Sequence, residues 1–301
     1  MIKHKISLVL LICLFSIAGY SQNSGLNKID YQKSLSAHLE LVKTLESQMK
    51  LIPQSTFSTL DKTHRAGDFY MSIYETTNEA YNAFLKDLEN YKLNDLVSEF
   101  KIDNSQWKKL SEAYETASKF YDTDTKYSQY PVVNITKEGA EAFCIWLTRL
   151  YAVYDQAKYP GAEFRLPTES EWLVAAAGGS KNAIYPWDGK FLTDKKGEYR
   201  ANFRVAGEEN IRLNPETGNV EILDDNVVYS TTLQPTKCHE PNNYGLYQMA
   251  GNAAELTVDG NVKGGSWHSF GHYMQIGAEQ ELNIGNLPNP FTGFRLVLIT
   301  K

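Results

Sequence analysis

Cysteine is scarce in this sequence, with 3 residues among 301, and none of them forms a CxxC pair. A small fold built on disulfides and a zinc site built on cysteine pairs are therefore excluded. The sequence also has no GxSxG, HExxH, Walker or GxGxxG motif, which removes the usual signals for the corresponding hydrolases, zinc proteases and nucleotide sites. With 42% hydrophobic and 22% charged residues, the chain has the composition of one large or two small globular domains.

Long apolar runs are also missing, since no stretch reaches the roughly 20 residues that a membrane-spanning helix needs. The N-terminus has two lysines, then an apolar run over residues 6–17, then the small residues Gly19 and Ser21. This order is typical of a secretory signal cleaved after Ser21. Cys13 lies inside the apolar run, which disfavours a lipid anchor. We expect residues 1–21 to be a signal peptide and the protein to be exported, as a periplasmic, outer-membrane-associated or secreted protein.

Basic residues are outnumbered, and the net charge of −6 becomes −8 when the two lysines of the signal leave. An acidic exported protein is a poor candidate for binding nucleic acid. Cleavage leaves Cys144 and Cys238. An oxidising compartment permits a disulfide between them, and the sequence leaves their pairing open.

Hydrophobic periodicity predicts where the helices and strands lie. Residues 22–50 form an amphipathic helical lead-in, residues 51–60 and 68–78 have strand patterns, and residues 81–121 are helical with Ser105 as a cap. Further helices are predicted after Thr136 and Thr168.

Two details refine these expectations. Thr168 and Glu171 have the spacing of a capping box, and Gly178–Gly179 is a stop signal. The isolated His38 and His64 are expected at the surface.

Beyond Pro186 the periodicity is lost. Residues 187–295 are rich in Gly, Asn, Asp, Tyr and Pro, with only short strand-like runs such as 220–223. The second half therefore reads as a loop-dominated α+β domain, in which such loops usually carry function or are held by ions.

Two stretches of this half contain candidate ligands. His268 and His272 have a ligand-like spacing, and Met274 nearby would suit copper, although the surrounding glycines favour a loop or strand of ordinary polar residues. The segment 251–261 supplies oxygen donors that suit a hard cation, with a plain turn as the alternative.

Seven segments then occur in the order of one family's motifs: LIPQSTF (51–57), FYMSIYETTNEAYNAFL (69–85), YPVVNITKEGAEAFCIWL (130–147), FRLPTESEWLVAAAGG (164–179), PNNYGLYQMAGNAAELTVD (241–259), VKGGSW (262–267) and TGFRLV (292–297). Together they resemble the formylglycine-generating enzyme family, the sulfatase-modifying-factor domain. The resemblance implies a single C-type-lectin-like domain of α+β class over residues 51–301. This domain would be loop-rich, would bind calcium, and would carry a helical insertion at about 86–129.

The resemblance also implies ligands for two calcium ions. One ion would be held by Asn202, the Phe203 carbonyl and a residue near Asn226. The other would be held by Gln248, the carbonyls of Gly251 and Ala253, and Glu255.

Family enzymes that oxidise a sulfatase cysteine hold copper with two cysteines after the GGS motif, and the matching positions here are Ser269 and Met274. Neither supplies the thiolate that Cu(I) needs, so the resemblance implies that this oxidation is absent and that copper or iron is not expected. Cys144 matches a structural cysteine of the family, whose partner position is Leu296. The iron-dependent branch has a helical domain with three histidines, whereas residues 22–50 contain only His38.

The interpretation that follows is a non-catalytic exported scaffold in a cell-envelope assembly, like silent relatives in gliding-motility and protein-secretion machinery. Its partner would be an envelope protein or a glycan, bound near Trp267, His268 and His272, or through the lead-in and the insertion. One alternative is a copper or iron oxidoreductase with a rebuilt histidine site. The other is a glycan-binding module.

Overall fold

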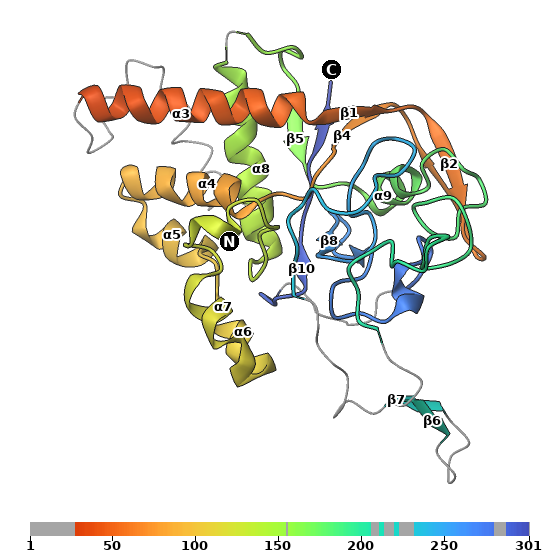
Figure 1. Ribbon diagram of the computed structural model, residues 1–301. Coiled ribbons are helices and arrows are strands. Elements are labelled where there is room, and N and C mark those ends of the chain that lie inside the picture. The colour runs from red at the N-terminus through yellow and green to blue at the C-terminus, as the bar shows by residue number, and fades with distance from the viewer. Residues whose placement is uncertain are drawn as a thin grey trace.

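The computed structural model describes residues 28–154, 156–205, 211–213, 220–222, 232–279 and 287–300. The expected signal peptide and Asn226 lie outside these residues. Helices gather on one side of the molecule, and short strands joined by long loops form the other side (Figure 1). No helix in the described part of the chain is long and apolar enough to cross a bilayer.

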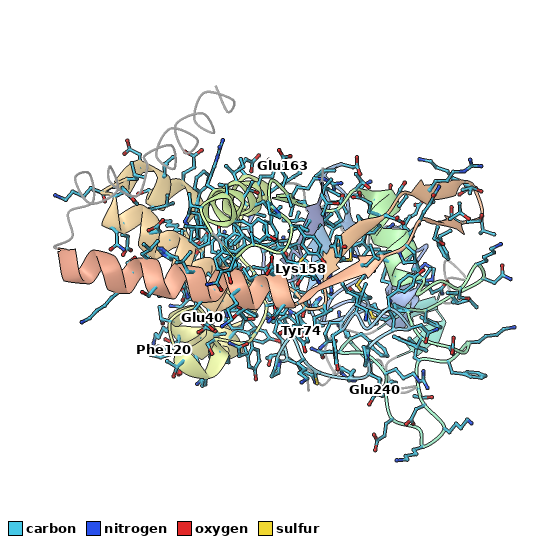
Figure 2. All side chains as sticks on the ribbon, turned by 90° about the horizontal axis from the view of Figure 1, so that it is seen from above. Glu40, Tyr74, Phe120, Lys158, Glu163 and Glu240 are labelled. Carbon is cyan, nitrogen blue, oxygen red and sulfur yellow. The ribbon has the colours of Figure 1, made fainter. Side chains whose placement is uncertain are left out.

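The helical side begins with α3 (Lys28–Ser47), which lies within the segment predicted as a helical lead-in and runs directly into the first strand (Figure 2). The other helices of this side are α4 (Asn78–Asn90), α5 (Asn94–Phe100), α6 (Ser105–Leu110), α7 (Glu115–Phe120) and α8 (Lys137–Ala152), with short 3-10 turns η1 (Glu112–Tyr114) and η2 (Thr125–Tyr127).

The central sheet has the order β1-β4-β11-β5, and every neighbouring pair is antiparallel. Its strands are β1 (Met49–Ile52), β4 (Phe69–Ser72), β11 (Val297–Ile299) and β5 (Glu163–Arg165). The last strand of the chain therefore lies inside the sheet, between strands from the beginning and the middle of the sequence.

Smaller sheets complete the loop-rich side. A hairpin joins β2 (Ser55–Ser58) to β3 (Thr63–Ala66), a three-stranded sheet has the order β10-β8-β9, and β6 pairs with β7. These strands are β8 (Ala254–Leu256), β9 (Val262–Lys263), β10 (Thr292–Gly293), β6 (Ile211–Leu213) and β7 (Val220–Ile222). Helix α9 (Glu169–Ala176) packs on the hairpin.

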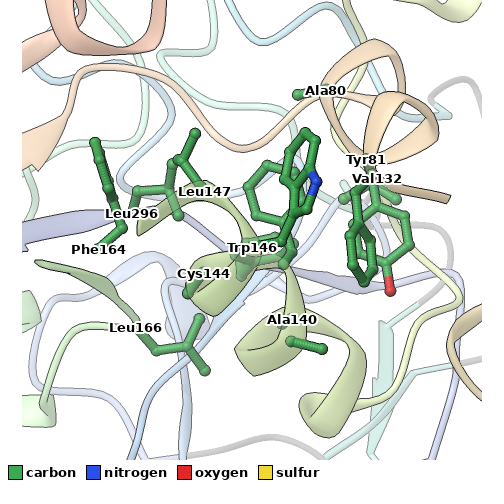
Figure 3. Packing of buried hydrophobic residues seen from close by; sticks show 14 of the residues in the cluster. Ala80, Tyr81, Val132, Ala140, Cys144, Trp146, Leu147, Phe164, Leu166 and Leu296 are labelled. Atoms are coloured by element: carbon green, nitrogen blue, oxygen red, sulfur yellow. The ribbon is translucent and has the colours of Figure 1, made fainter. Parts of the chain in front are cut away.

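Side chains of α8 join the helices to the central sheet. Trp146 and Leu147 pack with Tyr81 of α4 and with Phe164 of β5 in one buried cluster (Figure 3). Val42 of α3 is fully buried in the same cluster, so the lead-in helix is an integral part of the domain's core.

The helix starts test the cap predictions. Thr136 accepts a hydrogen bond from the Gly139 N–H, and Thr168 forms the predicted capping box with Glu171. The prediction for Ser105 was wrong by one residue, because Asn104 is the N-cap and the Ser105 hydroxyl donates to Asp103.

The expected surface positions of two histidines were also wrong, since His38 and His64 are 5% and 6% exposed. His38 lies beside Asp87 and Trp146, and the His64 ring is held by Ser170. Isolated polar residues in a sequence give no sign of a buried polar partner that lies far along the chain.

Candidate functional site

The GGSW segment forms a tight turn against the 3-10 helix η5 (Gly271–Met274). Gly265 has a φ of 66°, and a Cβ placed there would lie 2.5 Å from Met274 Cε. Only glycine fits this position, because it accepts the left-handed conformation and leaves room for the methionine. His272 lies on the 3-10 turn η5, whereas the glycines of this stretch predicted a loop or strand.

Ser269 and Met274, which the resemblance places at the family's cysteine positions, are both buried and both make structural contacts. The Ser266 N–H donates to Ser269 Oγ at 3.0 Å, and the two serine hydroxyls lie 3.1 Å apart. The Met274 side chain is 1% exposed and packs on Gly265. Ser269 thus stabilises the turn, and Met274 fills the space beside Gly265.

Trp267 is fixed in the core by the helical insertion. Its ring stacks on Trp107 of α6, with centroids 6.0 Å apart, and its Nε1–H donates to the Pro290 carbonyl at 2.9 Å. Tyr114 meets the same ring edge-on. At 1% exposure, Trp267 contributes packing to this region and offers no open face for a ligand.

The two histidines lie in different surroundings. The His268 ring is partly buried against Phe291, with centroids 4.8 Å apart. His272 is exposed, and Gln275 Nε2 lies 3.5 Å from its Nδ1. Within the described residues, no group of three or more His, Cys, Asp or Glu side chains is placed to hold a metal ion.

His272 lines a cleft of about 1040 Å³ next to the buried turn. The cleft lies between the β2–β3 hairpin, the start of α9, β9 and the segment after η5. Its lining residues are Phe57, Ser58, Thr59, Leu60, Asp61, His64, Glu169, Leu173, Ala183, Ile184, Asn261, Val262, Lys263, His272, Gln275, Gly277, Ala278 and Glu279.

The lining of this cleft carries more acid than base. Lys263 is paired with Glu169 at 3.2 Å, which leaves Asp61 and Glu279 as further carboxylates. Burial lowers the pKa of His64, so its ring is neutral at physiological pH. The cleft is therefore complementary to a positively charged partner.

Glu255 of β8 forms a buried ion pair with Arg295, which lies between β10 and β11. Arg295 and Glu255 are 0% and 1% exposed, and the guanidinium donates to both carboxylate oxygens at 2.6–2.8 Å. It also donates to the carbonyls of Ser72 and Tyr247. Trp172 Nε1–H supplies a further bond to Glu255 at 2.7 Å, so every oxygen of this carboxylate has two donors.

Glu75 is a second buried carboxylate in the same region. Its oxygens accept from Asn252 Nδ2 at 2.9 Å and from the Ala253 N–H at 3.0 Å. Burial, helped by the nearby negative charge of Glu255, raises the pKa of Glu75 to about 8. Glu75 is therefore mostly protonated at neutral pH.

Some of the residues that the resemblance implies as calcium ligands have free oxygens in the structure, whereas others have oxygens that are already hydrogen-bonded. Asn202 Oδ1 and the Gln248 amide are buried without hydrogen-bond partners among the described residues, and Phe203 is buried beside Asn202. Such orphaned oxygens fit calcium, which takes oxygen ligands. Glu255 does not fit in the same way, because its oxygens are already saturated by Arg295 and Trp172.

Gly251 and Ala253, whose carbonyls the resemblance implies for the second calcium ion, lie close to Asn202. Gly251 pairs with Asn202 across an isolated bridge, and a Cβ on Gly251 would lie only 2.3 Å from the Asn202 carbonyl oxygen. Ala253 is buried next to Asn252. The wider oxygen cluster of this stretch is not one site, since Asn252 contacts Glu75, whereas Asp259 accepts from the Glu169 N–H.

These features define the class of protein: a loop-rich α+β domain of the C-type-lectin-like kind, with the GGSW turn at its centre. A family model for the Sulfatase-modifying factor enzyme 1-like domain matches residues 44–299. The chain belongs to this family, as the seven sequence motifs predicted.

Several known proteins are similar to this chain. The formylglycine-generating enzyme of Bos taurus is 28% identical over 210 residues, which cover 64% of this chain and 48% of the relative. The "Inactive C-alpha-formylglycine-generating enzyme 2" of Bos taurus is 30% identical over 131 residues, or 43% of this chain and 33% of the relative. The family thus includes relatives described as inactive, and this chain spans about half or less of the length of these relatives.

A solved structure supports the fold alone. Treponema denticola variable protein 1 matches with a TM-score of 0.53 at 18% identity, covering 83% of this chain and 94% of that chain.

The sequence identified the turn but missed part of the site. Glu75 and His64 are far from the GGSW motif in the sequence, and only the fold brings them into this region. Cys144 and Cys238 are both free thiols in the structure, which answers the question that the sequence left open.

Replacing Arg295 should reveal how much the fold depends on the ion pair. Arg295→Ala leaves the Glu255 carboxylate buried without its counter-charge and should lower the free energy of unfolding by about 3–5 kcal/mol. Urea denaturation measures the change. The exposed Arg65→Ala is the control and should be near neutral, and a double variant Glu255→Leu/Arg295→Met should lose less than Arg295→Ala. A loss below about 1 kcal/mol in Arg295→Ala would contradict the assigned role.

The raised pKa of Glu75 predicts a pH dependence of stability. Below its ordinary pKa of 4.5, folded and unfolded chains are both protonated. Between 4.5 and about 8 the unfolded chain ionises first, so Glu75 increasingly disfavours folding as pH rises. Glu75→Gln should gain stability relative to wild type between pH 5 and pH 8, measured by urea unfolding. Glu112→Gln, at an exposed position, should show no such trend, and equal slopes for Glu75→Gln and wild type would refute the assignment.

Proposed function

We propose that this protein is a non-catalytic member of its family and acts as an exported binding scaffold in a protein assembly of the cell envelope. The observation that carries the proposal is the state of the two positions where family enzymes have cysteines. Ser269 is hydrogen-bonded into the turn, and Met274 is packed against Gly265. Both are committed to structure, and neither can supply the thiolate that copper-dependent oxidation requires.

The surface that remains for binding is the acidic cleft. Its volume of about 1040 Å³ is at the upper end of the range for ligand sites, which suits a polypeptide segment. Leu60 is fully exposed at the hairpin beside it, and Asp61 and Glu279 add negative charge. A partner segment with lysine or arginine near an apolar residue matches this surface.

The N-terminal sequence supports the location that we propose. The order of charge, apolar run and small residues at the N-terminus is that of a secretory signal. A relative described as inactive supports the proposal that a family member can lack the enzyme activity.

The cleft can be tested with a photo-cross-linking amino acid in place of Leu60, presented to the envelope fraction of the source cells. We expect one discrete cross-linked partner, weakened roughly tenfold by Asp61→Lys/Glu279→Lys at low salt. Glu240→Lys is the matched control, since this exposed residue (Figure 2) does not line the cleft. The same partner captured from position 120 on α7, or indifference to the cleft charges, would refute the cleft as the binding surface.

Calcium is proposed as a structural ion at two sites, one that uses the Asn202 amide oxygen and one that uses the Gln248 amide oxygen. An ion that binds only the folded chain stabilises it by mass action. Excess chelator should therefore lower Tm, and added calcium should restore it. Asn202→Ala and Gln248→Ala should each reduce the calcium-dependent part of Tm, whereas Asn182→Ala at the surface should not. A melting curve unchanged by chelator would contradict bound calcium.

Elemental analysis of the same preparation separates the scaffold from an oxidoreductase. Calcium without stoichiometric copper or iron is the expected result. Copper or iron bound at one ion per chain, and lost in His268→Ala/His272→Ala, would overturn the non-catalytic assignment.

A further inference from the structure

A second, smaller pocket of about 180 Å³ lies on the loop that follows α9. Most of its lining comes from residues 180–190, which lie between two of the motif segments. Its lining includes Ser180, Asn182, Tyr185, Trp187, Asp188 and Asn243. The volume is below the roughly 300 Å³ at which pockets for drug-sized ligands begin, so the occupant would be about the size of one ring.

Two aromatic rings form the apolar part of this pocket. Tyr185 and Trp187 stack nearly parallel, with centroids 5.1 Å apart and planes inclined by 7°. The Trp187 Nε1–H donates to the Phe191 carbonyl at 3.0 Å, which fixes the indole orientation. The Phe191 side chain is 76% exposed beside it. Tyr185 is buried, at 8% exposure, so the partly exposed Trp187 ring is the aromatic surface that this pair offers to the pocket. An aromatic ring held in one orientation, with an apolar face and a polar end, suits a binding site.

Amides form the polar part. Asn182 and Asn243 are exposed, line the pocket, and make no side-chain hydrogen bond to another described residue. Gly178, with a φ of 57°, allows the close approach of the Asn243 backbone, because a Cβ on it would lie 3.3 Å from the Asn243 nitrogen. Each amide offers both a donor and an acceptor. Asp188 and Lys190 line the same pocket with opposite charges.

From this combination we infer that the pocket binds one ring of a neutral saccharide. A pyranose has an apolar face of C–H groups, which matches an aromatic ring, and a rim of hydroxyls that both donate and accept, which matches the paired amides. A charged ligand is disfavoured because the charges of the lining cancel. A purely apolar ligand would leave the amides unpaired, which costs affinity. The inference does not depend on the proposed role of the cleft.

Saturation-transfer NMR tests the inference with three probes: the methyl glycosides of glucose, galactose and N-acetylglucosamine. Wild-type protein should transfer saturation to at least one of them, and cyclohexanol, which has a ring but only one hydroxyl, should not displace it. Asn182→Ala/Asn243→Ala should weaken binding roughly tenfold or more, because both polar contacts are lost. Gln54→Ala, at an exposed amide outside the pocket, should bind as wild type does.

Circular dichroism should show that the double variant folds, since both amides are exposed. Trp187→Phe, which keeps a ring but loses the bond to Phe191, should bind with intermediate affinity. The inference is overturned by absence of transfer to all three glycosides, or by equal transfer in wild type and Asn182→Ala/Asn243→Ala. Cross-linking from Leu60 should be unchanged in the double variant, so failure of the saccharide site is distinguishable from failure of the cleft.

Discussion

The ion pair between Glu255 and Arg295 is the interaction on which the rest of this structure depends. Two charges without access to water are costly unless each is fully paired. Here the Arg295 guanidinium donates hydrogen bonds to the carboxylate and to two carbonyls. The Trp172 Nε1–H of α9 donates a further bond to the carboxylate. Strand β8, the central sheet, the loop at Tyr247 and α9 therefore meet at one point. The GGSW turn and the cleft are built on that frame.

Much of this architecture could be predicted from the sequence, because local rules decide it. Two helices begin at a threonine cap, where Thr136 accepts a hydrogen bond from Gly139 and Thr168 accepts one from Glu171. Such pairs are three positions apart and can be recognised from their spacing in the sequence. The motif order identified the family and the loop-rich class. The buried polar contacts of the site were not predicted, because they join residues that are far apart in the sequence. The Glu75 contact with Asn252 spans 177 positions, and no periodic pattern in the sequence indicates it.

The GGSW turn is held in shape by contacts within its own segment. Gly265 and Ser266 remain, and the local backbone is fixed by hydrogen bonds between Ser266 and Ser269. Met274 has taken the space beneath Gly265. The stack of Trp107 on Trp267 ties the helical insertion to the same turn. Helix α6 is thus part of the support of the site.

The position of β11 in the central sheet bears on when the protein can fold. This strand comes from the last residues of the chain, yet it lies between β4 and β5, and Arg295 just before it supplies the charge that Glu255 needs. Contacts between distant parts of a chain form late, because the intervening loops must close first. A chain synthesised only as far as β10 would lack the strand that lies between β4 and β5, so the central sheet cannot close before β11 has been made.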